Sequence, residues 1–322
     1  MDASVLDLNL PETVDAICQR ITEYAGRMGK RGAVVAISGG IDSTVCATLA
    51  VRALGREHVL CIILPERDSS PRSARLGLLL AEHLGVEHLT HDIAATLEAI
   101  GCYHWRDEAI RRLVPEYRDD WKNKIVITGG LERGINVHKL VVEAPDGRRQ
   151  EKRIGPKEYL QIVAAQNFKQ RIRKTLEYFH ADRLNHVVVG TPNRLEYDQG
   201  FFVKNGDGSA DIKPIAHLYK TQVYALARHL GVPAELCGVR PTTDTFSLEQ
   251  GQDEFYFALP YEKMDLALWG KNHGVPAAEL GAALGLTAAQ AELVYRDIDA
   301  KRRATRYHHA RPELIEAIAE LK

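Results

Sequence analysis

Short apolar runs alternate with amphipathic segments along the first part of the chain. Runs rich in β-branched and small apolar residues occupy Ala33–Ile37, Val59–Leu64, Glu87–Ile93 and His186–Gly190. Such runs are typical of strands that are buried on both faces of a parallel sheet. Apolar residues at helical spacing predict helices at about 14–28, 42–53, 75–84, 156–179, 218–230, 261–272, 276–284, 287–303 and 312–321. This order predicts an α/β fold with a Rossmann-like parallel sheet flanked by helices.

The alternation is interrupted between about residues 102 and 157. Two strand-like runs, Val137–Val142 and Arg149–Ile154, surround the turn signal Pro145-Asp146-Gly147 and predict an inserted β-hairpin. From about residue 255 to 322 the pattern is helical. We therefore expect a single domain over residues 1–322, which includes an insertion at about 102–157 and a helical C-terminal part at about 255–322.

The segment Ser38-Gly39-Gly40-Ile41-Asp42-Ser43 follows the first predicted strand and begins a helix. In this arrangement backbone N–H groups and the positive end of the helix bind phosphate. The segment lacks the third glycine of the dinucleotide fingerprint and the Gly-Lys-Ser/Thr of the Walker loop. It resembles the pyrophosphate-binding loop of the ATP-pyrophosphatase superfamily, whose members adenylate a substrate and release pyrophosphate.

A second group of motifs narrows the resemblance. Residues 190–197, 200–214 and 218–223 resemble the central block of NAD synthetases of the ammonia-dependent type. Further matches are Asn167-x-Lys169-x-Arg171, Pro241-Thr242, Asp265 and Lys301-Arg302-Arg303, in the order of that family. The resemblance covers roughly Gly29 to Arg303 and implies the adenine nucleotide alpha hydrolase-like fold.

The resemblance implies that the protein makes an amide bond. Members of this family use ATP to adenylate the nicotinate carboxylate of deamido-NAD and release pyrophosphate, and ammonia then displaces AMP to give NAD. The implied ATP-binding residues are Ser38, Gly39, Gly40, Asp42, Ser43, Ser70, Thr191, Lys220 and Thr242. Asp42 and Glu196 would hold Mg²⁺, and these two with Lys220 are the implied catalytic residues. The implied residues for the acceptor substrate are Asn167, Arg171, Lys204 and Asp211.

The resemblance also predicts a homodimer, because in this family the acceptor pocket lies at a two-fold interface. About thirty residues precede the first predicted strand, too few for the glutaminase domain that is fused to some relatives. We expect the nucleophile to be free ammonia, or ammonia from a separate glutaminase.

Charge and cysteine usage exclude several other classes. The formal net charge is -1, from 42 basic and 43 acidic residues. This balance lacks the excess of positive charge that is typical of proteins that bind nucleic acid or an anionic membrane. No apolar run reaches the length of a membrane span, and Met1–Leu10 has no signal-peptide pattern. The five cysteines have no zinc-ligand spacing. These features predict a cytoplasmic protein without nucleic-acid or membrane partners.

Three alternatives remain open at this stage. Val203, Asn205 and Ser209 depart from the family pattern on the acceptor side, which favours a related ligase that amidates a different carboxylate. A tRNA-modifying ATP-pyrophosphatase would use the same phosphate loop, but the charge balance and the lack of paired catalytic cysteines oppose it. A nucleotide sensor without catalysis is the third alternative, and the presence of both Asp42 and Glu196 weighs against it.

Overall fold

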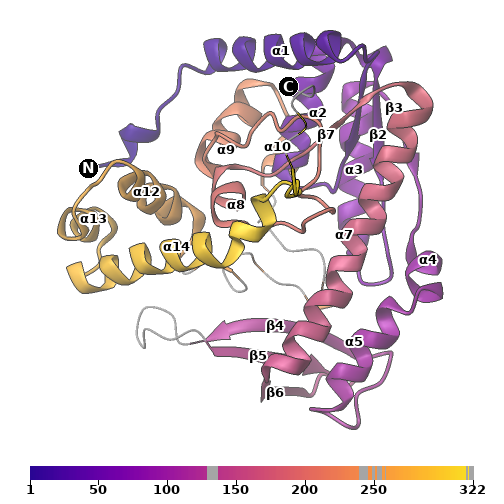
Figure 1. Cartoon of the computed structure of the whole chain (residues 1–322), viewed down its shortest axis with the longest axis vertical. Helices are drawn as coiled ribbons and strands as arrows, with labels where there is room; N and C mark the ends of the chain where they lie inside the picture. Colours follow the sequence, from indigo (N-terminus) through magenta and orange to yellow (C-terminus); the bar gives the residue numbers. More distant parts are fainter. Residues whose placement is uncertain are drawn as a thin grey trace.

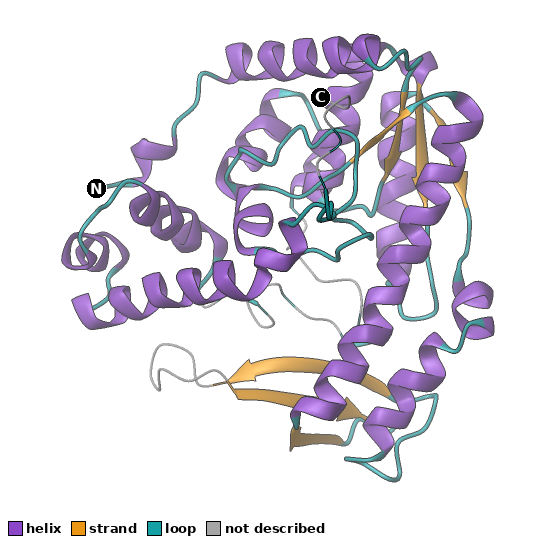
Figure 2. Ribbon diagram, viewed as in Figure 1, coloured by secondary structure: helices purple, strands orange, loops and turns teal. Residues whose placement is uncertain are grey.

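A four-stranded parallel sheet forms the centre of the molecule, as the sequence predicts (Figures 1 and 2). The computed structural model describes residues 1–128, 137–238, 246–248, 251, 256–257, 259–316 and 318. The strand order is β3-β2-β1-β7, and every neighbouring pair is parallel. The strands are β1 (Ala33–Ala36), β2 (Val59–Ile63), β3 (Glu87–Thr90) and β7 (Val187–Val189).

Helices cover both faces of this sheet, which explains its apolar strands. Val35, Cys61 and Val189 share a core with helices α1 (Leu10–Arg27), α2 (Ile41–Leu54), α3 (Pro71–Leu84), α9 (Lys220–His229) and α10 (Ala234–Cys237). The alternate residues Val34, Leu60 and Val188 share a second core with α4 (Ala94–Ala99), α5 (Cys102–Arg111) and the long helix α7 (Pro156–Leu184). Helix α7 runs five residues beyond the predicted end at Phe179 and stops at Asn185, whose φ of 57° is left-handed.

The predicted hairpin is confirmed as β5 and β6, and the insertion has one further strand. It contains a three-stranded antiparallel sheet of β4 (Lys122–Thr128), β5 (Val137–Glu143) and β6 (Arg149–Arg153), with β5 in the middle. The turn at Pro145-Asp146-Gly147 is confirmed, because Ala144 N–H bonds Arg148 C=O across it at 2.9 Å. The prediction missed β4 because Asn123, a polar residue, occupies a fully buried position and conceals the apolar alternation.

The chain then passes through α8 (Arg194–Gln199), which is not among the helices predicted from the sequence, and ends in a helical part. Helices α12 (Tyr261–Asn272), α13 (Ala277–Leu284) and α14 (Ala288–His309) pack with Leu195 and the short 3₁₀ turn Ala3–Leu6 in a separate core. Helix α14 continues past the predicted end at Arg303. The predicted helix at 312–321 is wrong for residues 312–316, which are not helical.

Candidate active site

The phosphate loop connects β1 to the start of α2. Gly39 has a φ of +77°, and a Cβ there would lie 2.7 Å from the backbone oxygen of Ser73, so a glycine is required. Within the loop, Ser38 N–H donates to Ser43 Oγ at 3.2 Å, and Thr44 Oγ1 donates to Gly40 C=O at 2.9 Å. The N-cap residue of α2, Gly40, makes no side-chain capping bond. The N-terminal N–H groups of α2 can therefore bind an anion.

Three predicted catalytic residues converge beside this loop from three helices. Lys220, at the start of α9, is 2% exposed and forms an ion pair with Asp42 in the first turn of α2. Asn193 connects the two carboxylates, because its Nδ2 donates to Asp42 Oδ1 at 3.1 Å and its backbone N–H donates to Glu196 Oε2 at 3.1 Å. Burial lowers the pKa of Lys220, but Asp42 and Glu196 outweigh this effect, so the net pKa is raised and the amine stays charged.

A single cavity of about 1340 Å³ joins the phosphate loop to the acceptor-side residues. Its wall includes Asn167 and Arg171 from α7 and Lys204 from the loop after α8. Arg171 Nε donates to the Lys204 carbonyl at 3.3 Å, while Lys204 Nζ donates to the carbonyls of Tyr307 and Ala310 at 3.0 and 3.1 Å. Other predicted residues in the wall are Ser38, Gly39, Gly40, Asp42, Ser43, Ser70, Thr191, Glu196 and Lys220. The volume exceeds the 300–1,000 Å³ of typical ligand pockets, roughly enough for two substrates.

Among the predicted residues that the structure describes, Asp211 is not one of those that line the cavity. The carboxylate of Asp211 accepts the Val188 N–H at 2.7 Å and the Tyr178 hydroxyl at 3.3 Å, so it joins the loop to the edge of β7. Thr242 lies outside the described residues.

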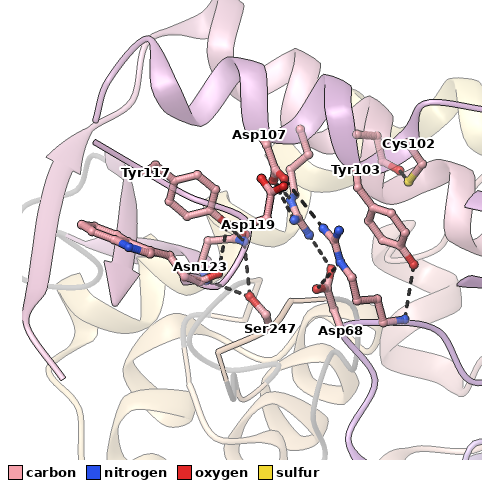
Figure 3. A network of polar contacts seen from close by, with 12 residues as sticks. Asp68, Cys102, Tyr103, Asp107, Tyr117, Asp119, Asn123 and Ser247 are labelled. Carbon is pink, nitrogen blue, oxygen red and sulfur yellow. Dashed lines mark hydrogen bonds and ion pairs between the residues drawn. The ribbon is translucent and has the colours of Figure 1, made fainter. Parts of the chain in front are cut away.

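The sequence did not reveal the network behind the loop that follows β2. Lys169, on α7, is fully buried and donates to Glu66 Oε1 at 3.0 Å and Asp68 Oδ2 at 2.7 Å. Arg106, on α5, pairs with the same Asp68 (Figure 3). The Tyr103 hydroxyl donates to Glu66 Oε2 at 2.8 Å.

This network stabilises the charged form of Asp68. Burial alone would raise the pKa of the Asp68 carboxyl, but Lys169 and Arg106 outweigh burial and lower it. The signal in the sequence was the acidic pair Glu66 and Asp68 directly after a buried strand. Lys169 was part of a recognised motif, but no partner was assigned to it.

The chemistry of Asp42 and Glu196 fits Mg²⁺, which proteins commonly bind through one or two carboxylates while phosphates and water complete the shell. Both carboxylates line the phosphate end of the cavity. Among the described residues, no cluster of three or more His, Cys, Asp or Glu side chains forms a metal site made by the protein alone.

The fold and the site together define an α/β nucleotide-binding protein whose phosphate loop, paired carboxylates and buried lysine share one large cavity. The chain belongs to the NAD synthase family, because its sequence matches that family over residues 13–116 and 127–308. It is 55% identical over 321 residues to the NH(3)-dependent NAD(+) synthetase of Rhizobium meliloti (strain 1021), which covers 99% of this chain and 96% of the relative. The enzyme of the same name from Thermotoga neapolitana is 40% identical over 255 residues, 79% of this chain and 81% of the relative.

Solved structures support the fold. The NMN synthetase of Francisella tularensis aligns with a TM-score of 0.67 at 23% identity, over 96% of this chain and 99% of that one. The NH3-dependent NAD synthetase of Campylobacter jejuni aligns with a TM-score of 0.63 at 22% identity, over 96% and 100% of the two chains. The described helices include none that is long and apolar enough to cross a membrane.

The position of Asp211 leads to a test of its role. We expect Asp211→Asn to lower the free energy of unfolding by about 1–3 kcal/mol, because a charge-assisted bond to the Val188 N–H is weakened. Denaturant unfolding measures this loss, and steady-state kinetics should show the KM for the acceptor within about twofold of wild type. A large rise in that KM with unchanged stability would instead restore the predicted role in acceptor binding.

Proposed function

We propose that this protein is an ammonia-dependent NAD synthetase, a ligase that converts deamido-NAD to NAD with ATP and ammonia. The observation that carries the proposal is the shared cavity, in which a phosphate loop with Asp42, Glu196 and Lys220 faces the acceptor-side residues Asn167, Arg171 and Lys204. The high identity to NH(3)-dependent NAD(+) synthetases supports deamido-NAD as the acceptor.

The first step activates the nicotinate carboxylate, which is a poor electrophile. One carboxylate oxygen forms a bond to the α-phosphorus of ATP, and the bond from that phosphorus to the bridging oxygen breaks to release pyrophosphate. The loop N–H groups and the Ser38 and Ser43 hydroxyls bind the departing phosphates, while the Lys220 ammonium neutralises their charge. This alignment and neutralisation are the main contributions that a protein makes to phosphoryl chemistry.

Mg²⁺ is the proposed cofactor, held by Asp42 and Glu196. When bound, it neutralises phosphate charge and orients the phosphate oxygens.

The second step forms the amide. Ammonia attacks the carbonyl carbon of the acyl adenylate, the bond to AMP breaks, and the nitrogen loses one proton. Arg171 and Lys204 are proposed to hold the phosphates of the acceptor, and Asn167 to orient it. The ammonia is free in solution or supplied by a separate glutaminase.

Two alternatives from the sequence lose their support. Asn205, one of the departures from the family pattern, has a φ of 60°, a left-handed conformation that asparagine tolerates well. This departure therefore has a backbone explanation that does not require a different carboxylate. A tRNA-modifying activity has no support from the relative whose alignment covers 99% of this chain at 55% identity, because that relative is an NH(3)-dependent NAD(+) synthetase.

The proposed homodimer rests on the resemblance to the family. We expect sedimentation equilibrium at micromolar concentration to give twice the mass of the chain. A strict monomer that makes NAD at full rate would rule out a role for the interface in acceptor binding.

The phosphate loop can be tested through Asp42. We expect Asp42→Asn, which preserves shape, to reduce pyrophosphate release by roughly a hundredfold or more, because the proposed metal ligand is lost. The assay follows pyrophosphate and NAD together with ATP, Mg²⁺, ammonium and deamido-NAD. The control is Asp15→Asn on α1, which removes an exposed carboxylate that lies 3.4 Å from Arg52 in the last turn of α2.

Equal amounts of pyrophosphate and NAD from the wild-type protein support the proposal. ATP binding with no NAD formed would contradict it and return the different-carboxylate ligase to consideration.

The acceptor side can be tested separately. We expect Lys204→Ala to raise the KM for deamido-NAD by about tenfold or more, the loss of one charge-assisted contact, while the KM for ATP stays near wild type. Lys204→Arg keeps the charge and should recover most of the affinity. If the KM for ATP rises instead, Lys204 belongs to the nucleotide side.

A further inference from the structure

The insertion has a small hydrophobic core of its own, to which a distant segment contributes. Buried residues from α5, β4, β5 and the first turns of α7 form this core, among them Ile110, Ile125, Val142 and Ile162. Phe246, 6% exposed, packs in the same core although it follows α7 by more than sixty residues. Its ring therefore fixes a short piece of the later chain, Phe246–Leu248, to the inserted sheet.

Hydrogen bonds at Asn123 reinforce this contact. The Asn123 backbone N–H donates to Ser247 Oγ at 2.8 Å, its Nδ2 donates to the same oxygen at 3.3 Å, and the Leu248 N–H donates to the Asn123 carbonyl at 3.1 Å. Asn123 Nδ2 also donates to the Tyr117 hydroxyl at 2.9 Å (Figure 3). These bonds satisfy the backbone groups and the Nδ2 of the fully buried Asn123, while its Oδ1 has no hydrogen-bond partner among the described residues.

The docked segment forms part of the cavity wall. Phe246 and Ser247 line the same cavity as the phosphate loop, whereas Asn123 does not line it. Thr242, a predicted ATP-binding residue, precedes Phe246 by four positions in the sequence.

The insertion also holds the loop that follows β2, which is part of the cavity wall. Arg106 of α5 pairs with Asp68, and the Arg67 guanidinium lies 3.8 Å from the ring centre of Tyr103 on the same helix. Ser70, at the end of this loop, is a proposed ATP-binding residue. One body, α5 with the three-stranded sheet, thus contacts both chain segments, as Figure 3 shows from Asp68 to Ser247.

We propose that the inserted sheet is a dock that holds Phe246–Leu248 in place on the wall of the nucleotide cavity, with Phe246 and Asn123 as positioning residues. The proposal rests on the proposed function for its nucleotide, ATP. A docked segment is already ordered before ATP binds. ATP binding therefore does not have to offset the entropy that would be lost by ordering this segment. Loss of the dock should weaken ATP binding and leave the turnover of bound substrates nearly unchanged.

The test compares Phe246→Ala with a control in the same core. Val142, fully buried on β5, belongs to the same core but is not among the residues that line the cavity. Val142→Ala therefore weakens the core without removing the docked ring. Calorimetry with ATP and Mg²⁺ gives the Kd, and hydrogen exchange of peptides that contain Leu248 reports the dock itself. We expect Phe246→Ala to raise the Kd for ATP roughly tenfold. The hydrogen-exchange rate at Leu248 should rise by roughly tenfold or more, and kcat should stay within about twofold of the wild-type value.

A second variant removes only the polar part of the dock. Asn123→Leu keeps the size of the side chain and removes its two Nδ2 bonds, so we expect a rise in the Kd of about threefold, with a melting temperature within about 2 °C of wild type. Asn123 cannot act by touching the ligand, because it is fully buried.

The outcomes separate the dock from general stability. If Phe246→Ala and Val142→Ala lower the melting temperature alike and leave the Kd and the Leu248 exchange unchanged, Phe246 is a packing residue and the proposal fails. A rise in the KM for deamido-NAD alone would overturn the assignment to the nucleotide. The hydrogen-exchange measurement does not depend on enzymatic activity. If the wild-type protein makes no NAD, the proposed function is refuted, and exchange at Leu248 still tests the dock.

Discussion

The buried ammonium of Lys169 on α7 constrains the position of the loop that follows β2. An isolated ammonium in a protein interior is costly, and removal of one partner from a buried ion pair costs about 3–5 kcal/mol. Glu66 and Asp68, directly after β2, supply the opposite charge at 3.0 and 2.7 Å. If the loop after β2 moved away from α7, the buried Lys169 ammonium would lose both of its carboxylate partners. These ion pairs therefore fix the position of the loop relative to α7 and the sheet.

A second buried lysine, Lys220, lines the cavity, whereas Lys169 is not among the lining residues. Lys169 is matched by two carboxylates, so it is suited to hold a loop rather than a substrate. Among the described residues the hydrogen-bond partner of the Lys220 ammonium is Asp42, which leaves donors for a phosphate oxygen. The two lysines are similarly buried. The number of carboxylates that each ammonium hydrogen-bonds, two for Lys169 and one for Lys220 among the described residues, separates a structural role from a proposed catalytic one.

The sequence predicted the parts of the molecule whose determinants are local. The strands and the phosphate loop are contiguous, so their apolar runs and the glycines at 39 and 40 were recognisable without tertiary information. Asn123 concealed β4 because its partner Ser247 lies 124 residues further along the chain. The role of Lys169 was equally hidden, since Asp68 lies 101 residues before it. Asp211 was assigned to the acceptor from a motif, and a motif does not show that a carboxylate is already bonded to the backbone of β7.

The long helix α7 connects these features into one rigid frame. Its 29 residues span about 43 Å at 1.5 Å per residue, and the helix passes from the inserted sheet to the central sheet (Figure 1). Ile162, near its start, packs in the core of the insertion, while Ala181, near its end, packs against the strands. Lys169 lies between these two contacts and holds the loop after β2. Because one continuous helix makes all three contacts, the inserted sheet has a defined position relative to the phosphate loop. A segment that docks on that sheet, such as Phe246–Leu248, therefore has a defined position relative to the phosphate loop. The contacts that hold this segment come from the insertion and not from the phosphate loop or α2.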